Sequence, residues 1–333
     1  MIKTKTDTLN YELNKNNIAQ TRYTNPEESK LLIANTKEII KFKELINILP
    51  NKSVLVLNKS SVRDVRIKTI KKTTGGKIEI FILNKISYNL CECLLNFSGP
   101  KNIGSFIDTD NFKFEIIDKN NGIYLIKTSS SIKKIIKNYG STPLPPYIKD
   151  NESQYKNYKS DYTKGGFSLA ASTAGLHFNN KILDKYRRKG IVVKFLNLDI
   201  GLGTFKPINS KYINDHKIHE EKYSMLKKDY NHILKLKEKG YVIYSVGTTV
   251  LRSLETIALS GKYKGVTDLY ITPGFRFKIV DYLITNFHAP KSTLLSIVLT
   301  IYGKNWKELY MYAQKKKMKF LSFGDGVLFK INE

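Results

Sequence analysis

Hydrophobic and polar residues alternate with a period of two over much of the chain between about residues 54 and 128. Turn sequences such as Gly75-Gly76 and Asn121-Gly122 separate the alternating segments, as is typical of strands joined by tight turns. The expected strands are "VLVLN", "DVRIKTIKK", "KIEIFIL", "NLCECLL", "FKFEII" and "GIYLIKT". This part of the chain is therefore predicted to be an all-β module.

The pattern ends at a proline-rich segment, "STPLPPYIKD" at 141–150. Proline has no backbone N–H and a fixed φ, so this segment can continue neither a helix nor a central strand. We therefore expect a domain boundary there.

Beyond residue 150 the hydrophobic period becomes helical. The segment "KILDKYRRKG" predicts a helix with Ile182, Leu183 and Tyr186 on one face and Gly190 as its stop. A second helix is expected from about 220 to 239. The order strand, loop, helix then occurs twice, in "YVIYSV", "GTT", "VLRSLETIAL" and in "DYLITNF", "HAPKST", "LLSIVLTIY". Such alternation predicts an α/β domain whose sites gather in loops at strand ends.

The chain is strongly basic, with 56 Lys and Arg against 29 Asp and Glu, a formal net charge of +27. This favours a polyanionic partner such as nucleic acid. The excess is almost all lysine, however, and it accompanies many Ile and Asn, as an AT-rich coding sequence would also produce. The charge alone leaves both explanations open.

Cysteine content and hydropathy indicate a cytoplasmic protein. Cys91 and Cys93 alternate with Glu92 on one predicted strand, a spacing unsuited to a disulfide between them. The first residues, "MIKTKTDTLN", lack an apolar segment, and the longest apolar run, "LLSIVLTIY", is far below the ~20 residues needed to cross a bilayer. We expect a protein that is neither exported nor membrane-spanning.

One predicted strand-to-helix loop, in "SVGTTVLRSLE", has the features of an anion site. Gly247 would let a ligand approach the backbone, and Thr248 or Thr249 would cap a helix whose free N–H groups bind a carboxylate or phosphate. An ordinary helix cap has the same sequence. Arg252 and Glu255 lie three residues apart on that helix, either facing the loops or forming a surface pair.

A second loop, "TNFHAPKSTLL", places Asn286, His288, Lys291 and Ser292 between an apolar strand and an apolar helix. Polar groups in such a position must be paired with one another or used by a ligand. His177 stands at the end of another uncharged segment, "SLAASTAGLHF". Either histidine is a proton-transfer candidate, or a structural residue bonded inside the core.

Two other chemistries have weak support. "HKIHEEKY" brings His216 and His219 near Glu220 and Glu221, but the zinc-protease pattern HExxH is missing and the cysteines lie in the other predicted domain. We therefore expect no metal. The sequence has no G-x-S-x-G elbow, which a nucleophilic serine would require. It also has no GxGxG-like strand-end loop, which a methyltransferase would require.

Together, these segments resemble the S-adenosylmethionine:tRNA ribosyltransferase-isomerase family of the queuosine pathway, over essentially the whole chain. The resemblance is carried, in the family's order, by "YELNKNNIAQ" (11–20), "VLVLNKSSVRDVRI" (54–67), "TGGKIEI" (74–80), "PLPPYI" (143–148), "TAGLHF" (173–178), "GLGTFKPI" (201–208), "HKIHEEKY" (216–223), "VGTTVLRSLE" (246–255), "TNFHAPKSTLL" (285–295) and "FLSFGDGVL" (320–328). It implies a large α/β domain, with a mixed sheet and helices, formed by residues 1–60 and 150–333. Residues 61–149 would be an inserted six-stranded β-barrel, and the protein a monomer.

The resemblance also implies the reaction. The ribosyl part of S-adenosylmethionine would be transferred to 7-aminomethyl-7-deazaguanine at the tRNA wobble position and isomerised, giving epoxyqueuosine, adenine and methionine. S-adenosylmethionine would be a co-substrate, with no further cofactor. The sulfonium acidifies the neighbouring ribose methylene, so a modest base removes its proton, and the departing adenine must be protonated. Acid–base groups with a pKa near neutrality suit these steps.

Site residues follow from the matched motifs. The catalytic candidates are His177 and His288, with Glu221 as an alternative base or an acceptor for a ribose hydroxyl. The substrate-binding candidates are Gly175, Gly203, Thr204, Gly247, Thr248, Thr249, Arg252, Glu255, Asn286, Lys291, Ser292 and Asp325. Within this set, Gly247, Thr248 and Thr249 would hold the methionine carboxylate with Arg252. The nucleic-acid-binding candidates are Asn58, Arg66 and Lys291.

The chain departs from the family pattern at four places. Ser172 stands where the family has Pro, and Asp199-Ile200 where it has His-Val. Lys319 to Leu321 replace Arg-Phe-Phe, and Pro26-Glu27 replace Arg-Asp. An anion in place of a histidine is the change of greatest chemical consequence. It supports one alternative, a catalytically decayed basic RNA-binding protein of the same fold.

Overall fold

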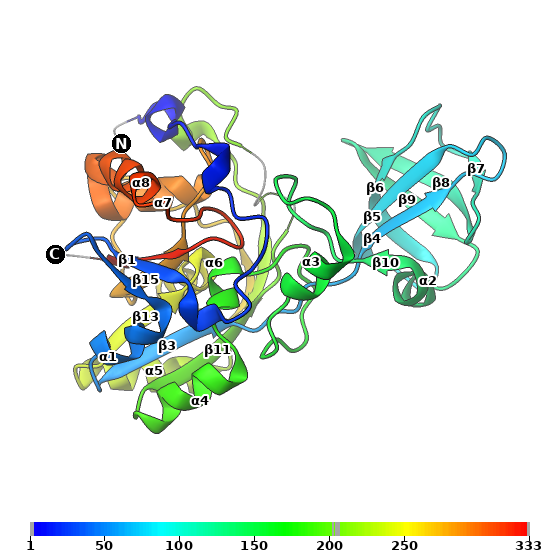
Figure 1. Cartoon of the computed structure of the whole chain (residues 1–333). Helices are drawn as coiled ribbons and strands as arrows, with labels where there is room; N and C mark the ends of the chain where they lie inside the picture. The colour runs from blue at the N-terminus through cyan, green and yellow to red at the C-terminus, as the bar shows by residue number, and fades with distance from the viewer. Residues whose placement is uncertain (1–2, 202, 204–206, 332–333) are drawn as a thin grey trace. The chain divides into compact units, whose positions relative to one another are not determined.

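The computed structural model describes residues 3–201, 203 and 207–331. The chain forms two compact units: a larger one made of Met1–Ser61 with Leu144–Glu333, and a smaller one made of Val62–Pro143. The smaller unit is thus an insertion in the larger, and its second boundary lies within the proline-rich segment. Figure 1 shows the course of the chain through both units.

The larger unit is built on a mixed sheet, which has nine strands among the described residues. The four interior strands β11, β3, β13 and β15 are parallel, whereas β12, β14, β16 and β2 introduce antiparallel pairs. In spatial order the strands are β14 (Lys264–Thr267), β12 (Glu221–Ser224), β11 (Val192–Leu198), β3 (Ser53–Asn58), β13 (Val242–Val246), β15 (Tyr282–Asn286), β16 (Gly326–Lys330), β1 (Lys30–Ile33) and β2 (Glu38–Lys41).

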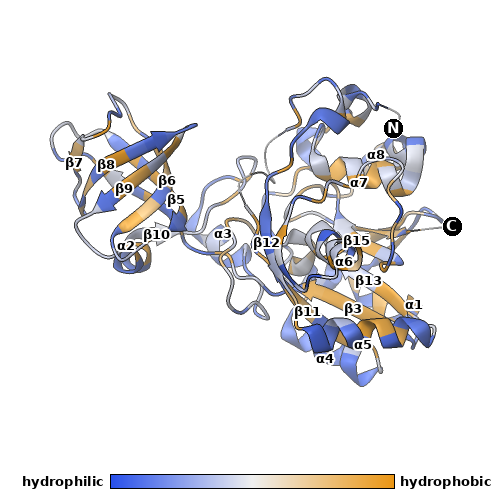
Figure 2. Cartoon of the chain, turned by 180° about the vertical axis from the view of Figure 1, so that it is seen from behind, coloured by the Kyte–Doolittle hydropathy of each residue, from blue (hydrophilic) through white to orange (hydrophobic). Residues whose placement is uncertain are grey.

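Strand β3 lies inside this sheet because its sequence is a continuous apolar run. All six residues of "SVLVLN" are buried, as expected for a parallel strand covered on both faces. The hydrophobic pattern assigned "VLVLN" to the all-β module, which was wrong, since β3 pairs with β11 and β13. The family resemblance had placed this segment, within residues 1–60, in the large α/β domain. Figure 2 shows the hydrophobic residues concentrated in such central strands.

Helices cover the sheet, and most agree with the hydrophobic period. In α4 the residues Ile182, Leu183 and Tyr186 are buried on one face, and Gly190 follows with φ 88°, which confirms the predicted face and stop. None of the described helices is long and apolar enough to cross a membrane. The helices of the larger unit are α1 (Leu45–Ile48), α3 (Glu152–Asn157), α4 (Asn180–Arg188), α5 (Lys227–Glu238), α6 (Thr248–Ser260), α7 (Thr293–Tyr302) and α8 (Trp306–Lys315).

One predicted helix begins later than expected. Residues Glu221–Ser224 form β12, and α5 begins only at Lys227. Glu221 and Tyr223 are buried while Lys222 between them is exposed, which is the period of a strand. Four residues are too few for that period to be distinguished from the start of an amphipathic helix.

The smaller unit is a curled antiparallel sheet with seven strands among its residues, one of them the two-residue β10 (Figure 1). A single bridge joins Lys71, after β4, to Thr109, after β7. In spatial order the strands are β10 (Gly140–Ser141), β4 (Arg66–Ile70), β5 (Lys77–Lys85), β6 (Leu90–Asn96), β9 (Ile123–Thr128), β8 (Lys113–Asn120) and β7 (Phe106–Asp108). Cys91 and Cys93 are buried on one face of β6 and are free thiols.

The smaller unit is not all-β, because Ile132–Tyr139 form the helix α2. Ser131 caps this helix by accepting a hydrogen bond from Lys134 N, 3.2 Å away. Ile132 and Ile135 are buried and Lys133, Lys134 and Lys137 are exposed, a helical period that the strand-based prediction overlooked.

Six strand ends meet at one edge of the large sheet, here called the strand-end edge. The carboxyl ends of β3, β11, β13 and β15 lie there because these strands are parallel. The amino ends of β16 and β1 join them, since Gly326 pairs with both Asn286 and Leu31. Side chains from distant parts of the sequence therefore converge at this edge.

A buried carboxylate on α6 fixes the segment that enters β15. Glu255 accepts hydrogen bonds from the backbone N–H groups of Lys278, Ile279 and Val280, at 2.7, 3.1 and 3.1 Å. Its side chain is fully buried, and burial raises its pKa against the lowering effect of these three donors. Glu255, a substrate-binding candidate from the sequence, thus has both oxygens occupied by backbone groups.

We expect Glu255→Gln to lower the free energy of unfolding by about 2–4 kcal/mol, because the amide nitrogen cannot accept the N–H groups that the carboxylate binds. Urea denaturation of the whole protein measures the change. Glu238→Gln is the matched control, since Glu238 is exposed at the end of α5 and should change stability by less than about 0.5 kcal/mol. Equal effects of the two variants would contradict a structural role for Glu255.

Candidate active site

A cavity of about 190 Å³ lies at the strand-end edge of the larger unit. Its described lining is largely apolar, with hydroxyl groups, one amide and one imidazole, and it includes no Asp, Glu, Lys or Arg. It is lined by Pro146, Tyr147, Ala171, Ser172, Thr173, Ala174, Ile200, Pro207, Gly247, Thr248, Thr249, Thr285, Asn286, Phe287, His288, Ala289, Pro290, Ser292, Leu294, Leu321 and Ser322.

His288 lies in the cavity wall, directly after β15. Its Nε2 is 3.1 Å from Thr285 Oγ1, and its backbone is fixed by the hydroxyls of Tyr11 and Tyr310. Burial lowers the pKa of His288 to about 3, in place of the near-neutral value expected from the sequence. The ring is therefore neutral at pH 7, with a free lone pair, and it is a weaker base than an ordinary histidine.

Tyr147 is a second titratable group of the wall, and the sequence analysis did not single it out. Its hydroxyl is 2.7 Å from Ser322 Oγ, and burial raises its pKa to about 12, so it carries its proton at pH 7. Tyr147 belongs to "PLPPYI" and Ser322 to "FLSFGDGVL", two segments of the family resemblance. The signal in the sequence that could have identified Tyr147 is its place inside a rigid proline-rich motif.

His177 lies behind Asn286 and outside the cavity lining. Its Nδ1 is 2.9 Å from Ser29 Oγ and its Nε2 is 3.4 Å from Asn286 Nδ2. The ring stacks on Phe42, with 4.7 Å between ring centroids. Burial, helped by the nearby charge of Arg22, lowers the pKa of His177 to about 3.

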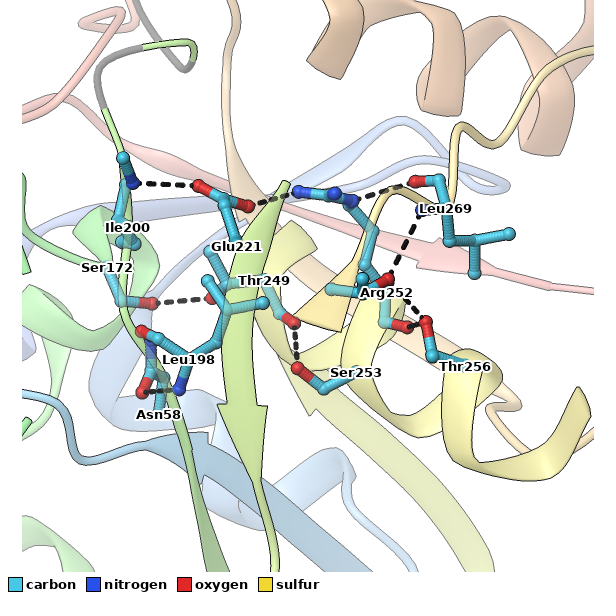
Figure 3. Close-up of polar contacts among 12 residues, drawn as sticks. Asn58, Ser172, Leu198, Ile200, Glu221, Thr249, Arg252, Ser253, Thr256 and Leu269 are labelled. Atoms are coloured by element: carbon cyan, nitrogen blue, oxygen red, sulfur yellow. Dashed lines mark hydrogen bonds and ion pairs between the residues drawn. The ribbon is translucent and has the colours of Figure 1, made fainter. Parts of the chain in front are cut away.

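The amino end of α6 opens into the cavity. Gly247 has φ 92°, a conformation that favours glycine, and an added Cβ would lie 3.2 Å from Ser172 Oγ. No side chain caps α6, and the first N–H groups of a helix lack partners within it. Thr249 Oγ1 is 3.2 Å from Ser172 Oγ (Figure 3). Ser292 instead caps α7 and also lines the cavity.

Glu221 and Arg252 form a buried ion pair (Figure 3). The other carboxylate oxygen accepts Gly201 N at 3.0 Å, and Arg252 Nε donates to Leu269 O at 2.9 Å. Arg252 Nη2 is buried and has no hydrogen-bond partner in the described part of the chain. The two side chains border a smaller cavity of about 20 Å³ with His219 and others, so Arg252 faces this cavity, beside the main one.

Asp325 holds three segments together at the strand-end edge. Its Oδ1 accepts from Tyr23 OH and Lys30 N, at 2.9 and 2.8 Å, and its Oδ2 accepts from Lys319 N at 2.7 Å. The side chain is fully buried and its pKa is raised by that burial. These donors occupy both oxygens.

The candidates for nucleic-acid binding are placed differently from one another. Asn58 is buried, donating to Leu198 O at 2.9 Å and accepting from Leu198 N and Ser60 N. Arg66, on β4 in the smaller unit, pairs with Glu79. Lys291 is partly exposed and pairs with Asp7 at 2.8 Å.

Two glycine candidates make close approaches. An added Cβ at Gly175 would clash with Tyr162 Oη, and one at Gly203 would clash with the ring of His219. Thr204 lies outside the described residues. No group of three or more metal-ligating side chains occurs among the residues that the structure describes.

Asp199, at the main departure from the family pattern, accepts hydrogen bonds from Ser60 Oγ at 2.5 Å and Phe167 N at 2.8 Å. An anion in place of the family's histidine would change the chemistry only if it faced the reacting groups. Asp199 does not line the cavity, whereas its neighbour Ile200 does.

Comparison with known proteins places the whole chain in one family. A family model described as "Queuosine biosynthesis protein" matches residues 6–329. An S-adenosylmethionine:tRNA ribosyltransferase-isomerase of Staphylococcus haemolyticus is 37% identical over 334 residues, covering 96% of this chain and 98% of the relative. The enzyme of the same name from a Sulfurihydrogenibium species is 38% identical over 333 residues, covering 97% of this chain and 99% of the relative.

A solved structure agrees with these relatives. The crystal structure of an S-adenosylmethionine tRNA ribosyltransferase from Thermotoga maritima matches with a TM-score of 0.54 and 29% sequence identity. The match covers 96% of this chain and 99% of that one, so it includes both units.

The two buried histidines predict a loss of stability in mild acid. Their folded pKa of about 3 lies below the ordinary value of about 6.5, so the unfolded chain binds more protons. The stabilisation is complete above the unfolded pKa and is lost as the pH falls toward the folded one. Between pH 8 and pH 5 we expect a loss of about 2 kcal/mol per histidine.

Urea denaturation of wild type and His177→Phe at both pH values measures this effect. The variant should lose about 2 kcal/mol less than wild type over that interval. Identical losses in the two proteins would mean that His177 titrates normally when folded.

Proposed function

The chain belongs to the family of queuosine biosynthesis proteins. We propose how its described residues carry out the reaction of an S-adenosylmethionine:tRNA ribosyltransferase-isomerase. The reaction moves the ribosyl group of S-adenosylmethionine to 7-aminomethyl-7-deazaguanine in tRNA, giving epoxyqueuosine and releasing adenine and methionine. The nearly full-length match to named relatives carries this conclusion. A cavity at the strand-end edge, with groups suited to proton transfer, supports it.

His288 and Tyr147 are the proton-transfer groups in this proposal, because both line the cavity and differ in protonation at pH 7. Neutral His288 accepts a proton from the ribose carbon beside the sulfonium. Protonated Tyr147 donates a proton to the departing adenine. The uncharged wall by itself disfavours the imidazolium and the phenolate that these steps form. Each transfer nevertheless leaves the total charge of the cavity unchanged, because the substrate loses or gains the same proton.

The methionine carboxylate lies at the amino end of α6. The free N–H groups of Thr248 and Thr249 attract an anion, and Gly247 leaves room for it beside the backbone. Arg252 contributes at longer range, because Glu221 already neutralises it. No resident metal or redox cofactor has a part in this mechanism.

The smaller unit serves as a tRNA-binding domain, and we infer that its curled sheet closes into a barrel, supported by the bridge from Lys71 to Thr109. Its helix α2 exposes Lys133, Lys134 and Lys137 and contains no acidic residue. Among the described residues, none of these lysines forms an ion pair. Their free charges suit RNA phosphates.

Beside α2 lies an aromatic ring suited to stacking on a base. The carbonyl of Tyr88 accepts Ile132 N at 2.9 Å, which fixes Tyr88 at the start of the helix. Its side chain is exposed, with 72% of its surface accessible. Exposed tyrosine next to basic side chains is typical of single-stranded RNA contacts.

The function is tested by incubating the purified protein with S-adenosylmethionine and tRNA bearing the precursor base, followed by mass spectrometry of digested nucleosides. We expect epoxyqueuosine, with adenine and methionine released. His288→Ala should lower turnover by about 10²- to 10⁴-fold, because it removes the proton acceptor.

His232→Ala is the matched control for that variant, because His232 is an exposed histidine on α5. It should leave turnover and stability unchanged. Retained tRNA binding without any epoxyqueuosine from wild type would instead favour the decayed RNA-binding protein.

The tRNA surface is tested by replacing Lys133, Lys134 and Lys137 with alanine together. If each lysine neutralises one phosphate, the slope of log affinity against log salt becomes shallower by about 2 to 3. A control triple variant of exposed lysines in the larger unit, Lys228, Lys235 and Lys262, carries the same charge change. Equal loss of tRNA affinity in both variants would show that only the total charge matters.

A further inference from the structure

The carboxamide of Asn286 is only half satisfied, although the residue is 2% exposed. Its Nδ2 donates to Gly324 O at 3.3 Å and lies 3.4 Å from His177 Nε2. Its Oδ1 is buried and has no hydrogen-bond partner among the residues that the structure describes. Asn286 also lines the cavity, so a ligand there is the natural source of the missing donor.

The orientation of this amide is set by a chain of hydrogen bonds. Ser29 Oγ gives its single proton to Pro26 O, 2.7 Å away, and must therefore accept from His177 Nδ1. With its proton on Nδ1, neutral His177 has a lone pair on Nε2. Asn286 must then present its NH₂ group to Nε2 and to Gly324 O, which leaves Oδ1 on the other side.

The surroundings determine which donor fits. Since no acidic residue occurs among the described residues of the cavity wall, an ammonium group there would lack a counter-charge. Ile200, Leu294 and Leu321 instead offer apolar contact to a flat, neutral ring. An exocyclic amino group on a heterocycle meets both conditions.

We propose that Asn286 Oδ1 accepts a hydrogen bond from the exocyclic amino group of a 6-aminopurine, and that His177 is the positioning residue that keeps this oxygen available. The proposal rests on the proposed function, because S-adenosylmethionine supplies such a purine. It gives His177 a role other than proton transfer. The site then recognises the purine that leaves during the reaction.

A purine with a 6-oxo group provides the sharpest probe, because it places an acceptor against Asn286 Oδ1. The full-length protein is titrated with S-adenosylhomocysteine and with S-inosylhomocysteine in a calorimeter. We expect wild type to bind the 6-amino compound about tenfold to hundredfold more tightly. Equal affinities, or no binding of the 6-amino compound, would overturn the proposal.

The positioning role is tested with His177→Phe, which keeps an aromatic ring against Phe42 but removes the Nε2 acceptor. Asn286 then keeps only Gly324 O of the two acceptors that hold its NH₂ group, so its orientation is less firmly fixed and the preference should fall severalfold. A purely structural histidine would change stability and leave the preference intact, which would refute the positioning role. His232→Phe, at an exposed position, is the control.

Ser29→Ala is a second variant if His177→Phe does not fold. It removes the acceptor that fixes the imidazole proton on Nδ1, so the preference should again weaken. An unchanged preference in this variant would overturn the positioning chain. If wild type forms no epoxyqueuosine but still prefers the 6-amino compound, the result counts against the proposed function alone. If wild type turns over but binds the 6-amino and 6-oxo compounds equally, the result counts against this proposal alone.

Discussion

The buried carboxylate of Asp325 is the contact on which the arrangement of the site depends. A fully buried carboxylate is stable only when donors surround it, and Asp325 obtains two of them from the backbones of Lys30 and Lys319. Lys30 follows Ser29 in the chain, and Asp325 follows Gly324. The hydrogen bonds of Asp325 therefore fix Ser29 and Gly324. These two residues are the ends of the chain of hydrogen bonds that runs through His177 and Asn286.

The buried charges serve the fold, and the cavity itself is neutral. Glu255 and Asp325 accept backbone N–H groups, and Glu221 and Arg252 neutralise one another. The sulfonium of the substrate finds no counter-charge in the described part of this wall, so its positive charge is not offset in the ground state. No anion among the described lining residues traps it in the ground state, while neutral imidazole and phenol groups remain able to move protons.

The sequence predicted the long periodic elements and the residues that end parallel strands. The face of α4 and the loops holding Gly247 and His288 were identified, because burial imposes the period and parallel strands bring their ends together. The hydrophobic pattern missed the strand β12 and the sheet to which β3 belongs, since it reports burial and not the pairing partner. Only the family resemblance placed β3 in the large α/β domain. Tyr147 and Ser322, 175 residues apart, meet only in the folded chain.

The departure at Asp199 lies beside the candidate site, and its side chain is held outside the cavity. Consecutive residues of extended chain point to opposite sides, and it is Ile200 that lines the cavity. Asp199 turns the other way and accepts from Ser60 and Phe167, holding the segment before Ala171. The substitution therefore lies at the position of that segment, and His288, Tyr147 and Asn286 line the cavity without contacting it.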